Sequence, residues 1–248
     1  MKICSIFNKN SDSCNGKCCV ICNIIATIVI SLIVSLIVNA TMGASRVKSV
    51  IKKDPEFIVD SINEMYKKKQ DEERKNREKK APEVAKSLNE KNNPYLGNKN
   101  GSKVIIEFFD YACGHCKKQS QELHKVIQQN KDVKVVLADL AIMSQHSLLS
   151  AQVGVYIGLY APSKMEKYYL GMSKEQVTPE NIKKVLKNIG LPENYVERAT
   201  KDTKVREVLE RNFNAARDMG LQGTPALVIG DKFIPGMITA DDIISILK

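Results

Sequence analysis

Two cysteines separated by two residues carry the chemistry that this sequence indicates most clearly. Cys113 and Cys116 follow an apolar run, Val104–Phe109, which is rich in β-branched and aromatic residues and short enough to be a strand buried on both faces. Helical periodicity begins at Cys116, so the first sulfur is expected at a helix N-terminus. The unpaired backbone N–H groups and the dipole at such an end favour a thiolate. The spacing therefore predicts a pair that alternates between dithiol and disulfide.

Two further side chains are suited to handling protons and charge beside this pair. Glu107 places a carboxyl group inside the apolar run, where burial raises its pKa and lets it exchange a proton with Cys116. The alternative interpretation is a strand-edge Glu107 that faces water. His115 is expected to stabilise the Cys113 thiolate by charge and hydrogen bonding. We predict that Cys113 is the nucleophile and that Cys116 resolves the mixed disulfide.

The stretch Glu-Phe-Phe-Asp-Tyr-x-Cys-x-His-Cys resembles the active-site strand of the DsbA-like thiol–disulfide oxidoreductases, which have a thioredoxin fold. The acid of that family lies six residues before the first cysteine, as Glu107 does. A second similar element is Leu221–Gly230, followed by Ile234-Pro235-Gly236. The resemblance implies that Pro225 follows a cis peptide bond and lies against the dithiol. It also implies that Thr224 offers backbone groups to a bound substrate peptide.

The expected fold class is α/β, a thioredoxin-like domain over residues 93–248 with an inserted all-helical subdomain at about 147–220. One helix there is expected to begin with Thr178 as N-cap and Pro179 at its first position, and Thr239 is expected to cap the final helix. The last helix of the insertion, Asp202–Met219, should bury one face, formed by Val205, Val208, Leu209, Phe213 and Ala216. The predicted strands are Val104–Phe109, Val133–Leu140, Ala226–Ile229 and Lys232–Ile234.

The N-terminal part of the chain predicts export. Residues 1–19 form a polar tail, expected on the cytoplasmic side, and residues 20–40 form a nearly unbroken apolar run. About twenty apolar residues suffice to span a bilayer, so this run is either a signal-anchor or a signal peptide. The remaining cysteines lack the paired spacing or histidine partners of a zinc site, so we predict unpaired thiols and no metal. They are Cys4, Cys14, Cys18, Cys19 and Cys22.

Residues 41–92 are expected to form a charged helical stalk, with helix from Asp54 to Asn92. A short apolar stripe near its start is followed by Lys67–Lys80, which contains no apolar residue, so a sustained coiled coil is excluded. Two interpretations follow. Either the stripe joins two or three copies of the protein, or the segment is only a spacer. Some DsbA-like proteins, of the suppressor-of-copper-sensitivity type, oligomerise through a similar extension. The stripe consists of Phe57, Ile58, Ile62, Met65 and Tyr66.

Composition excludes several other classes of function. The net charge is +10 over 248 residues, but no aromatic-interleaved basic patch or recognition motif points to nucleic acid. The sequence has no nucleotide-binding glycine loop, no HExxH and no nucleophile elbow, and it implies no cofactor.

We therefore predict a protein disulfide oxidoreductase that forms disulfides in unfolded or misoxidised exported proteins, together with a membrane redox partner. The expected location is the bacterial periplasm or cell exterior, anchored to the inner membrane by residues 20–40 or secreted if the leader is cleaved. Whether the protein acts as an oxidase or an isomerase stays open. Gly114-His115 resembles the dipeptide of disulfide isomerases, and a threonine at the position of Thr224 is also seen in isomerase-type relatives. The alternatives are an oligomeric isomerase or reductase kept reduced by a membrane partner, and a membrane-anchored surface or binding protein with an idle thioredoxin fold.

Overall fold

The computed structural model describes residues 24–38, 49, 52, 55–90 and 92–248. Contacts divide the chain into two units, one ending at Lys69 and one beginning at Gln70. In the first unit, residues 24–38 are helical, and helix α2 begins at Pro55. None of the helices in the described part of the chain combines the length and apolar composition needed to cross a bilayer. The predicted tail 1–19, its cysteines and Cys22, and the two ends of the apolar run, 20–23 and 39–40, lie outside the described residues.

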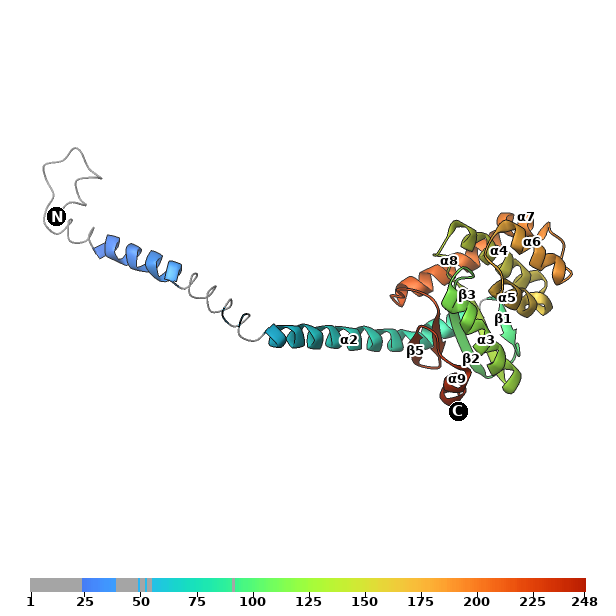
Figure 1. Ribbon diagram of the computed structural model, residues 1–248, viewed down its shortest axis with the longest axis horizontal. Coiled ribbons are helices and arrows are strands. Elements are labelled where there is room, and N and C mark those ends of the chain that lie inside the picture. The colour runs from blue at the N-terminus through green and yellow to red at the C-terminus, as the bar shows by residue number, and fades with distance from the viewer. Residues whose placement is uncertain (1–23, 39–48, 50–51, 53–54, 91) are drawn as a thin grey trace, which may run out of the picture. The chain divides into compact units, whose positions relative to one another are not determined.

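A five-stranded sheet, counted over the described residues, forms the centre of the second unit (Figure 1). Its spatial order is β1-β3-β2-β4-β5. Strands β2 and β3 are parallel and are joined through helix α3, whereas the other neighbouring strands are antiparallel. This is the order expected of a thioredoxin-like core. The strands are β1 Tyr95–Gly97, β2 Lys103–Phe109, β3 Val133–Asp139, β4 Ala226–Ile229 and β5 Lys232–Pro235, and the helix is α3 Gly114–Gln129.

Strand β2 lies between β3 and β4 and is buried on both faces, as its apolar sequence predicts. Ile106 and Phe108 point into one hydrophobic cluster, while Ile105 and Phe109 belong to the other. Glu107 lies in the second set by alternation along the strand, and it pairs with Leu137 of β3 and Leu227 of β4. The expected burial of Glu107 is confirmed, and the edge-strand interpretation is wrong.

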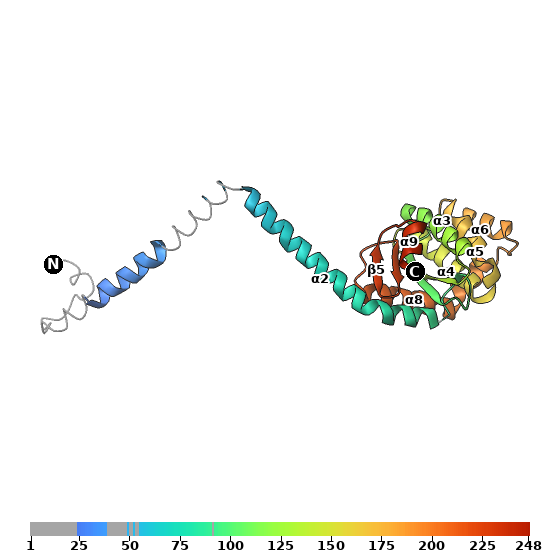
Figure 2. The same ribbon diagram turned by 90° about the horizontal axis from the view of Figure 1, so that it is seen from below.

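The two faces of the sheet are covered by different helices. The second half of α2, Pro55–Glu90, buries Ala81 and Leu88 beside Ala216 of α8, Thr203–Asp218. It runs alongside β5 and α8 (Figure 2). Residues of α3 and of the helical insertion cover the opposite face. The sequence placed the start of the compact domain after residue 92, but the structure joins residues 70–90 to it, because these apolar contacts bind α2 to the sheet.

The region between β3 and β4 is helical, as predicted, and its caps follow the sequence. The Thr178 side chain accepts a hydrogen bond from Asn181 N at 3.2 Å, and Asp202 caps α8 in the same way. The expected buried face of α8 is wrong at one position, because Phe213 is 52 % exposed. The helical elements are α4 Gln145–Tyr160, η1 Pro162–Lys164, α5 Met165–Ser173, α6 Pro179–Asn188, α7 Tyr195–Lys201 and α8 Thr203–Asp218, followed after β5 by α9 Ala240–Ile246.

Candidate active site

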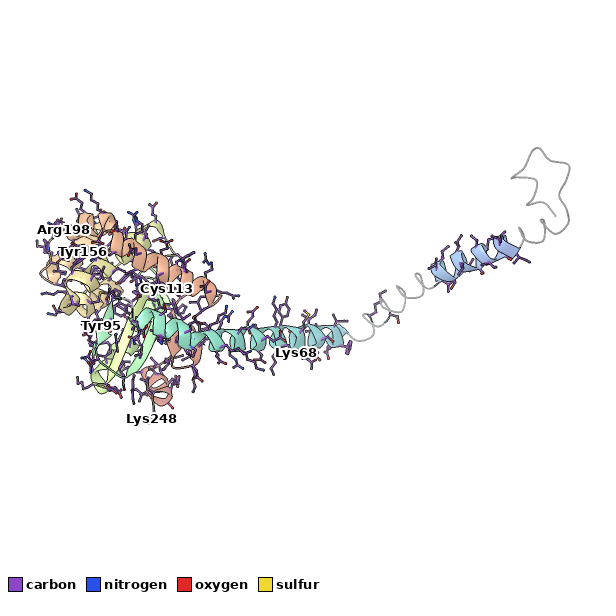
Figure 3. All side chains as sticks on the ribbon, turned by 180° about the vertical axis from the view of Figure 1, so that it is seen from behind. Lys68, Tyr95, Cys113, Tyr156, Arg198 and Lys248 are labelled. Carbon is purple, nitrogen blue, oxygen red and sulfur yellow. The ribbon has the colours of Figure 1, made fainter. Side chains whose placement is uncertain are left out.

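Cys113, which is labelled in Figure 3, is the N-cap of α3, and this confirms its predicted place at a strand-to-helix junction. Its backbone is extended, and its sulfur accepts a hydrogen bond from Cys116 N at 3.5 Å. The Cys113 amide donates to the carbonyl of Asp110 at 3.0 Å, which closes the turn between β2 and the helix. The first-turn N–H groups and the helix dipole therefore act on the Cys113 sulfur.

The two thiols have opposite electrostatic environments. Burial raises the pKa of Cys113, but the nearby polar groups of Thr224 and Cys116 and the backbone N–H groups of Cys116 and His115 outweigh it, so the pKa lies below its ordinary value. Burial, with a smaller contribution from the charge of Glu107, holds the pKa of Cys116 far above its ordinary value. The environment therefore favours Cys113 as the thiolate and Cys116 as the thiol that keeps its proton.

Glu107 lies fully buried beneath this pair. Burial raises the pKa of Glu107. The Tyr169 hydroxyl donates a hydrogen bond to Glu107 Oε2 at 2.6 Å, which opposes part of this rise, and the resulting pKa is about 8. Glu107 is thus a neutral acid near pH 7, and it lies close enough to Cys116 for its charge to raise the pKa of that thiol. A buried group with a pKa in this range can take and return a proton in that pH range.

Replacing Tyr169 by Phe is expected to raise the pKa of Glu107 further, by roughly one unit, because a hydrogen bond to a charged acceptor is lost. The measurement is a pH titration of the Glu107 carboxyl carbon by NMR. Tyr168→Phe is the matched control, since the Tyr168 hydroxyl donates instead to the carbonyl of Ser150 at 3.2 Å. Equal titration curves for the two variants would contradict the assigned role of Tyr169.

Thr224 and Pro225 lie against the dithiol, and the peptide bond between them is cis, as the resemblance implies. The thiol of Cys113 donates to the carbonyl of Thr224, with a sulfur–oxygen distance of 3.3 Å. The carbonyl of Pro225 accepts from Gly236 N at 2.9 Å, which ties the loop to the end of β5. The structure therefore brings together two motifs that are far apart in the sequence.

His115 is exposed, and the contribution to the Cys113 pKa that the structure assigns to it comes from its backbone N–H. This differs from the expected action of its imidazole, which stays a prediction. The physical reason is position: a residue in the first turn points an unpaired amide at the cap, whereas its side chain points outward.

Asp110 is a site residue that sequence reasoning missed. Its Oδ1 accepts from Ala112 N at 2.7 Å, and its Oδ2 accepts from the amides of Ile142 and Met143 at 2.8 and 2.9 Å. Asp110 therefore holds the turn before Cys113 and the loop after β3 together. An acidic residue directly after an apolar strand was the signal that could have identified it.

Asp139 is a second buried acid that sequence reasoning missed. It lies at the end of β3, opposite Phe109, and burial followed by the charges of Asp110 and Glu107 holds its pKa well above the ordinary range. Tyr169, from the helical insertion, was also missed, and no spacing in the sequence connects it to Glu107.

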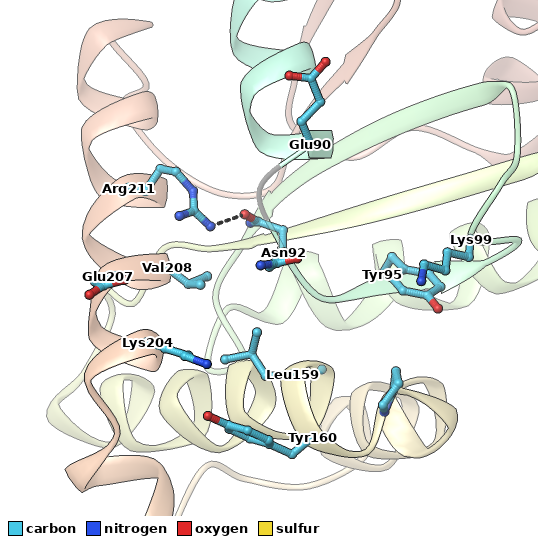
Figure 4. Close-up of a pocket in the computed structure, with 13 residues that line it drawn as sticks. Glu90, Asn92, Tyr95, Lys99, Leu159, Tyr160, Lys204, Glu207, Val208 and Arg211 are labelled. Atoms are coloured by element: carbon cyan, nitrogen blue, oxygen red, sulfur yellow. Dashed lines mark hydrogen bonds between the residues drawn. The ribbon is translucent and has the colours of Figure 1, made fainter.

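A large hollow in the described part of the chain lies elsewhere, with a volume of about 660 Å³ (Figure 4). It is formed by the end of α2, β1, α4 and α8, and Arg211 donates to Asn93 Oδ1 at 3.0 Å along its wall. None of the predicted site residues lines it. The chemistry is therefore placed by the dithiol and its partners and not by cavity size.

Comparisons with known proteins agree with this geometry. Residues 104–248 match the family described as DSBA-like thioredoxin domain. The chain is 25% identical to disulfide bond formation protein D of Bacillus subtilis over 166 residues, which covers 62% of this chain and 74% of that protein. It is also 25% identical to thiol:disulfide interchange protein DsbA of Yersinia pestis over 146 residues, or 54% and 69% of the two chains. The crystal structure of Proteus mirabilis ScsC in a transitional conformation superposes with a TM-score of 0.62 at 26% identity, and covers 81% of this chain and 91% of that chain.

Proposed function

The chain belongs to the DsbA-like thioredoxin family, and from that premise we propose that it forms disulfide bonds in exported proteins through Cys113 and Cys116. Thiol–disulfide exchange is the chemistry of this family. One observation carries the proposal for this chain. Cys113, with a lowered pKa, lies at a helix N-terminus against the carbonyl of Thr224, beside a cis proline.

The proposed reaction balances without a cofactor. A client thiolate attacks Cys113 of the oxidised enzyme, the bond between Cys113 and Cys116 breaks, and Cys116 receives the electron pair and then the proton of Glu107. A second client thiolate attacks the client sulfur of the mixed disulfide, and Cys113 leaves as the thiolate. The client loses two electrons, the enzyme dithiol gains them, and a membrane redox partner restores the disulfide.

The remaining site residues have proposed supporting roles. The lowered pKa of Cys113 makes it a good leaving group, and the raised pKa of Cys116 keeps the resolving thiol protonated until Glu107 accepts its proton. Thr224 is proposed to pair with the client backbone in the manner of an added strand, since its N–H makes no hydrogen bond to a described residue. The exposed imidazole of His115 is proposed to add positive charge near the Cys113 thiolate.

A second candidate function, an oligomeric isomerase, is favoured by one observation on α2. Near the start of this helix, Phe57, Val59, Ile62, Met65 and Tyr66 expose large apolar side chains. An apolar set of this kind supports association of two or three copies. The Gly-His dipeptide between the cysteines also supports an isomerase.

We propose that the domain works in an oxidising compartment, the periplasm or the cell exterior, because a dithiol oxidant is effective there. Residues 20–40 are proposed to deliver it, as a leader that is cleaved or as an inner-membrane anchor. Detection of the mature N-terminus by mass spectrometry separates these two forms.

The test is the reduction potential of the Cys113–Cys116 pair in the full chain, with the oligomeric state recorded on the same sample. Potentials of oxidases and isomerases lie near −120 and −180 mV, a difference of about 3 kcal/mol for two electrons. A value near the first, in a monomer, supports disulfide formation. A lower value in a dimer or trimer supports the isomerase. A pair that forms no intramolecular disulfide refutes both and leaves the idle-fold alternative.

A further inference from the structure

Two neighbouring hollows lie between α2 and the loop that carries the cis proline. The inner one has a volume of about 220 Å³ and the outer one about 300 Å³. They share Arg77 and Gln222 in their walls, so they form one continuous groove, which we call the α2 groove. Residues of α2 that line it are Glu73, Asn76, Arg77 and Lys80.

The inner part of the α2 groove lies along the loop that contacts the reacting sulfur. Thr224 and Pro225 line its inner part, and the Thr224 carbonyl is 3.3 Å from Cys113 Sγ. A client cysteine bonded to Cys113 is therefore expected near the inner end. The residues beside that cysteine can then extend past Pro225 toward α2.

Arg77 is held in place where the two hollows meet. Its guanidinium carbon lies 5.4 Å from the centre of the Phe233 ring, and its Nη2 is 3.2 Å from Glu73 Oε2. The side chain is only 18 % exposed. A guanidinium that is stacked on an aromatic ring and partly shielded from water interacts more strongly with an anion than a free surface lysine does.

The lining combines an apolar floor with an excess of positive charge. Phe233, Pro225, Leu221 and Pro235 supply apolar surface. The outer hollow is lined by three basic side chains and two acidic ones. The basic residues are Arg77, Lys80 and Arg217, and the acidic residues are Glu73 and Asp218. The Lys80 ammonium donates to the Asp218 carbonyl at 2.5 Å, so α2 is fastened to the end of α8 at the outer hollow.

We propose that the α2 groove binds an extended, cysteine-containing segment of the client, and that Arg77 selects segments with an acidic side chain near the cysteine. This inference rests on the proposed thiol–disulfide exchange and adds a substrate preference to it. The second half of α2 then belongs to the substrate site, beyond its role in covering the sheet.

The test compares peptide disulfides that differ only in the residues flanking the cysteine, Asp or Glu in one series and Lys in the other. The full-length protein is expected to prefer the acidic series by roughly fivefold in kcat/KM, the size of one ion pair near the surface. Arg77→Gln is expected to abolish this preference through KM, with kcat and the reduction potential unchanged. Arg77→Lys, which keeps the charge, is expected to retain most of it.

Arg74→Gln is the matched control, because Arg74 lies on the same helix, pairs with Asp71 at 3.1 Å and does not line the groove. It should leave the preference intact. A preference that persists in Arg77→Gln, or that the unmodified protein lacks, overturns the inference while exchange itself continues. Absence of exchange with every peptide in a folded chain instead refutes the proposed function.

Discussion

Replacing Cys113 by Ser is expected to remove all catalysed thiol–disulfide exchange, whereas replacing Cys116 by Ser is expected to trap clients on the protein. Among the described residues, Cys113 is the thiol that combines a lowered pKa with contact to the cis-proline loop at Thr224, so we expect the mixed disulfide to form there. Without Cys116 the Cys113 thiolate still attacks a client disulfide and forms the mixed disulfide, with the other client sulfur leaving as a thiolate. No buried thiol then attacks that mixed disulfide. The two variants therefore fail at different steps.

Non-reducing electrophoresis and intact mass spectrometry separate these outcomes. The Cys116→Ser protein should carry one client chain per molecule, released by a reductant, while the Cys113→Ser protein should carry none. Circular dichroism provides the control for folding, since both side chains are buried. Client adducts on Cys116 in the Cys113→Ser protein would contradict the assigned order of attack.

Replacing Glu107 by Gln is expected to stabilise the fold at neutral pH. The pKa of Glu107 rises from 4.5 to about 8 on folding, so the folded chain keeps a proton that the unfolded chain releases. The free energy of unfolding associated with Glu107 is therefore lost as the pH rises from about 4.5 to about 8. A glutamine has no proton to lose, and at pH 7 the variant should gain about 3 kcal/mol, with little difference at pH 4.

Urea unfolding of both proteins at pH 4 and pH 7 measures this effect. Glu122→Gln is a control of opposite sign, because hydrogen bonds from Lys125 and Ala240 lower the pKa of Glu122, so its contribution is present at neutral pH and lost in acid. The Glu107→Gln protein should also exchange more slowly, on the order of a hundredfold, because Cys116 has lost the group that gives it a proton and takes that proton back. Stabilisation without slower exchange would limit Glu107 to a structural role.

The features predicted from sequence are those that short, continuous stretches specify. Val104–Phe109 is apolar except for Glu107 and becomes the central strand, and the cysteine spacing fixes which sulfur caps the helix. The capping residues Thr178 and Thr239 act within three or four residues of the chain. In these cases, local chemistry and the global fold require the same conformation.

The features that sequence missed depend on contacts between distant segments. Strand β1 is three residues long and lies in a turn-rich stretch, where only its pairing with β3 makes it a strand. Tyr169 reaches Glu107 only after the insertion folds over the sheet. Arg77 belongs to a run with no apolar residue, which predicts a solvated helix, yet the Phe233 ring lies under its guanidinium.

The hydrogen bonds of Asp110 have a consequence for local opening motions. The Asp110 carboxylate accepts hydrogen bonds both from the turn before Cys113 and from the amides of Ile142 and Met143. Ile142 and Met143 are 49 % and 58 % exposed. The loop therefore cannot lift away without also freeing the turn, and the two segments open as one cooperative unit. Their amide protons then exchange with solvent at a common rate.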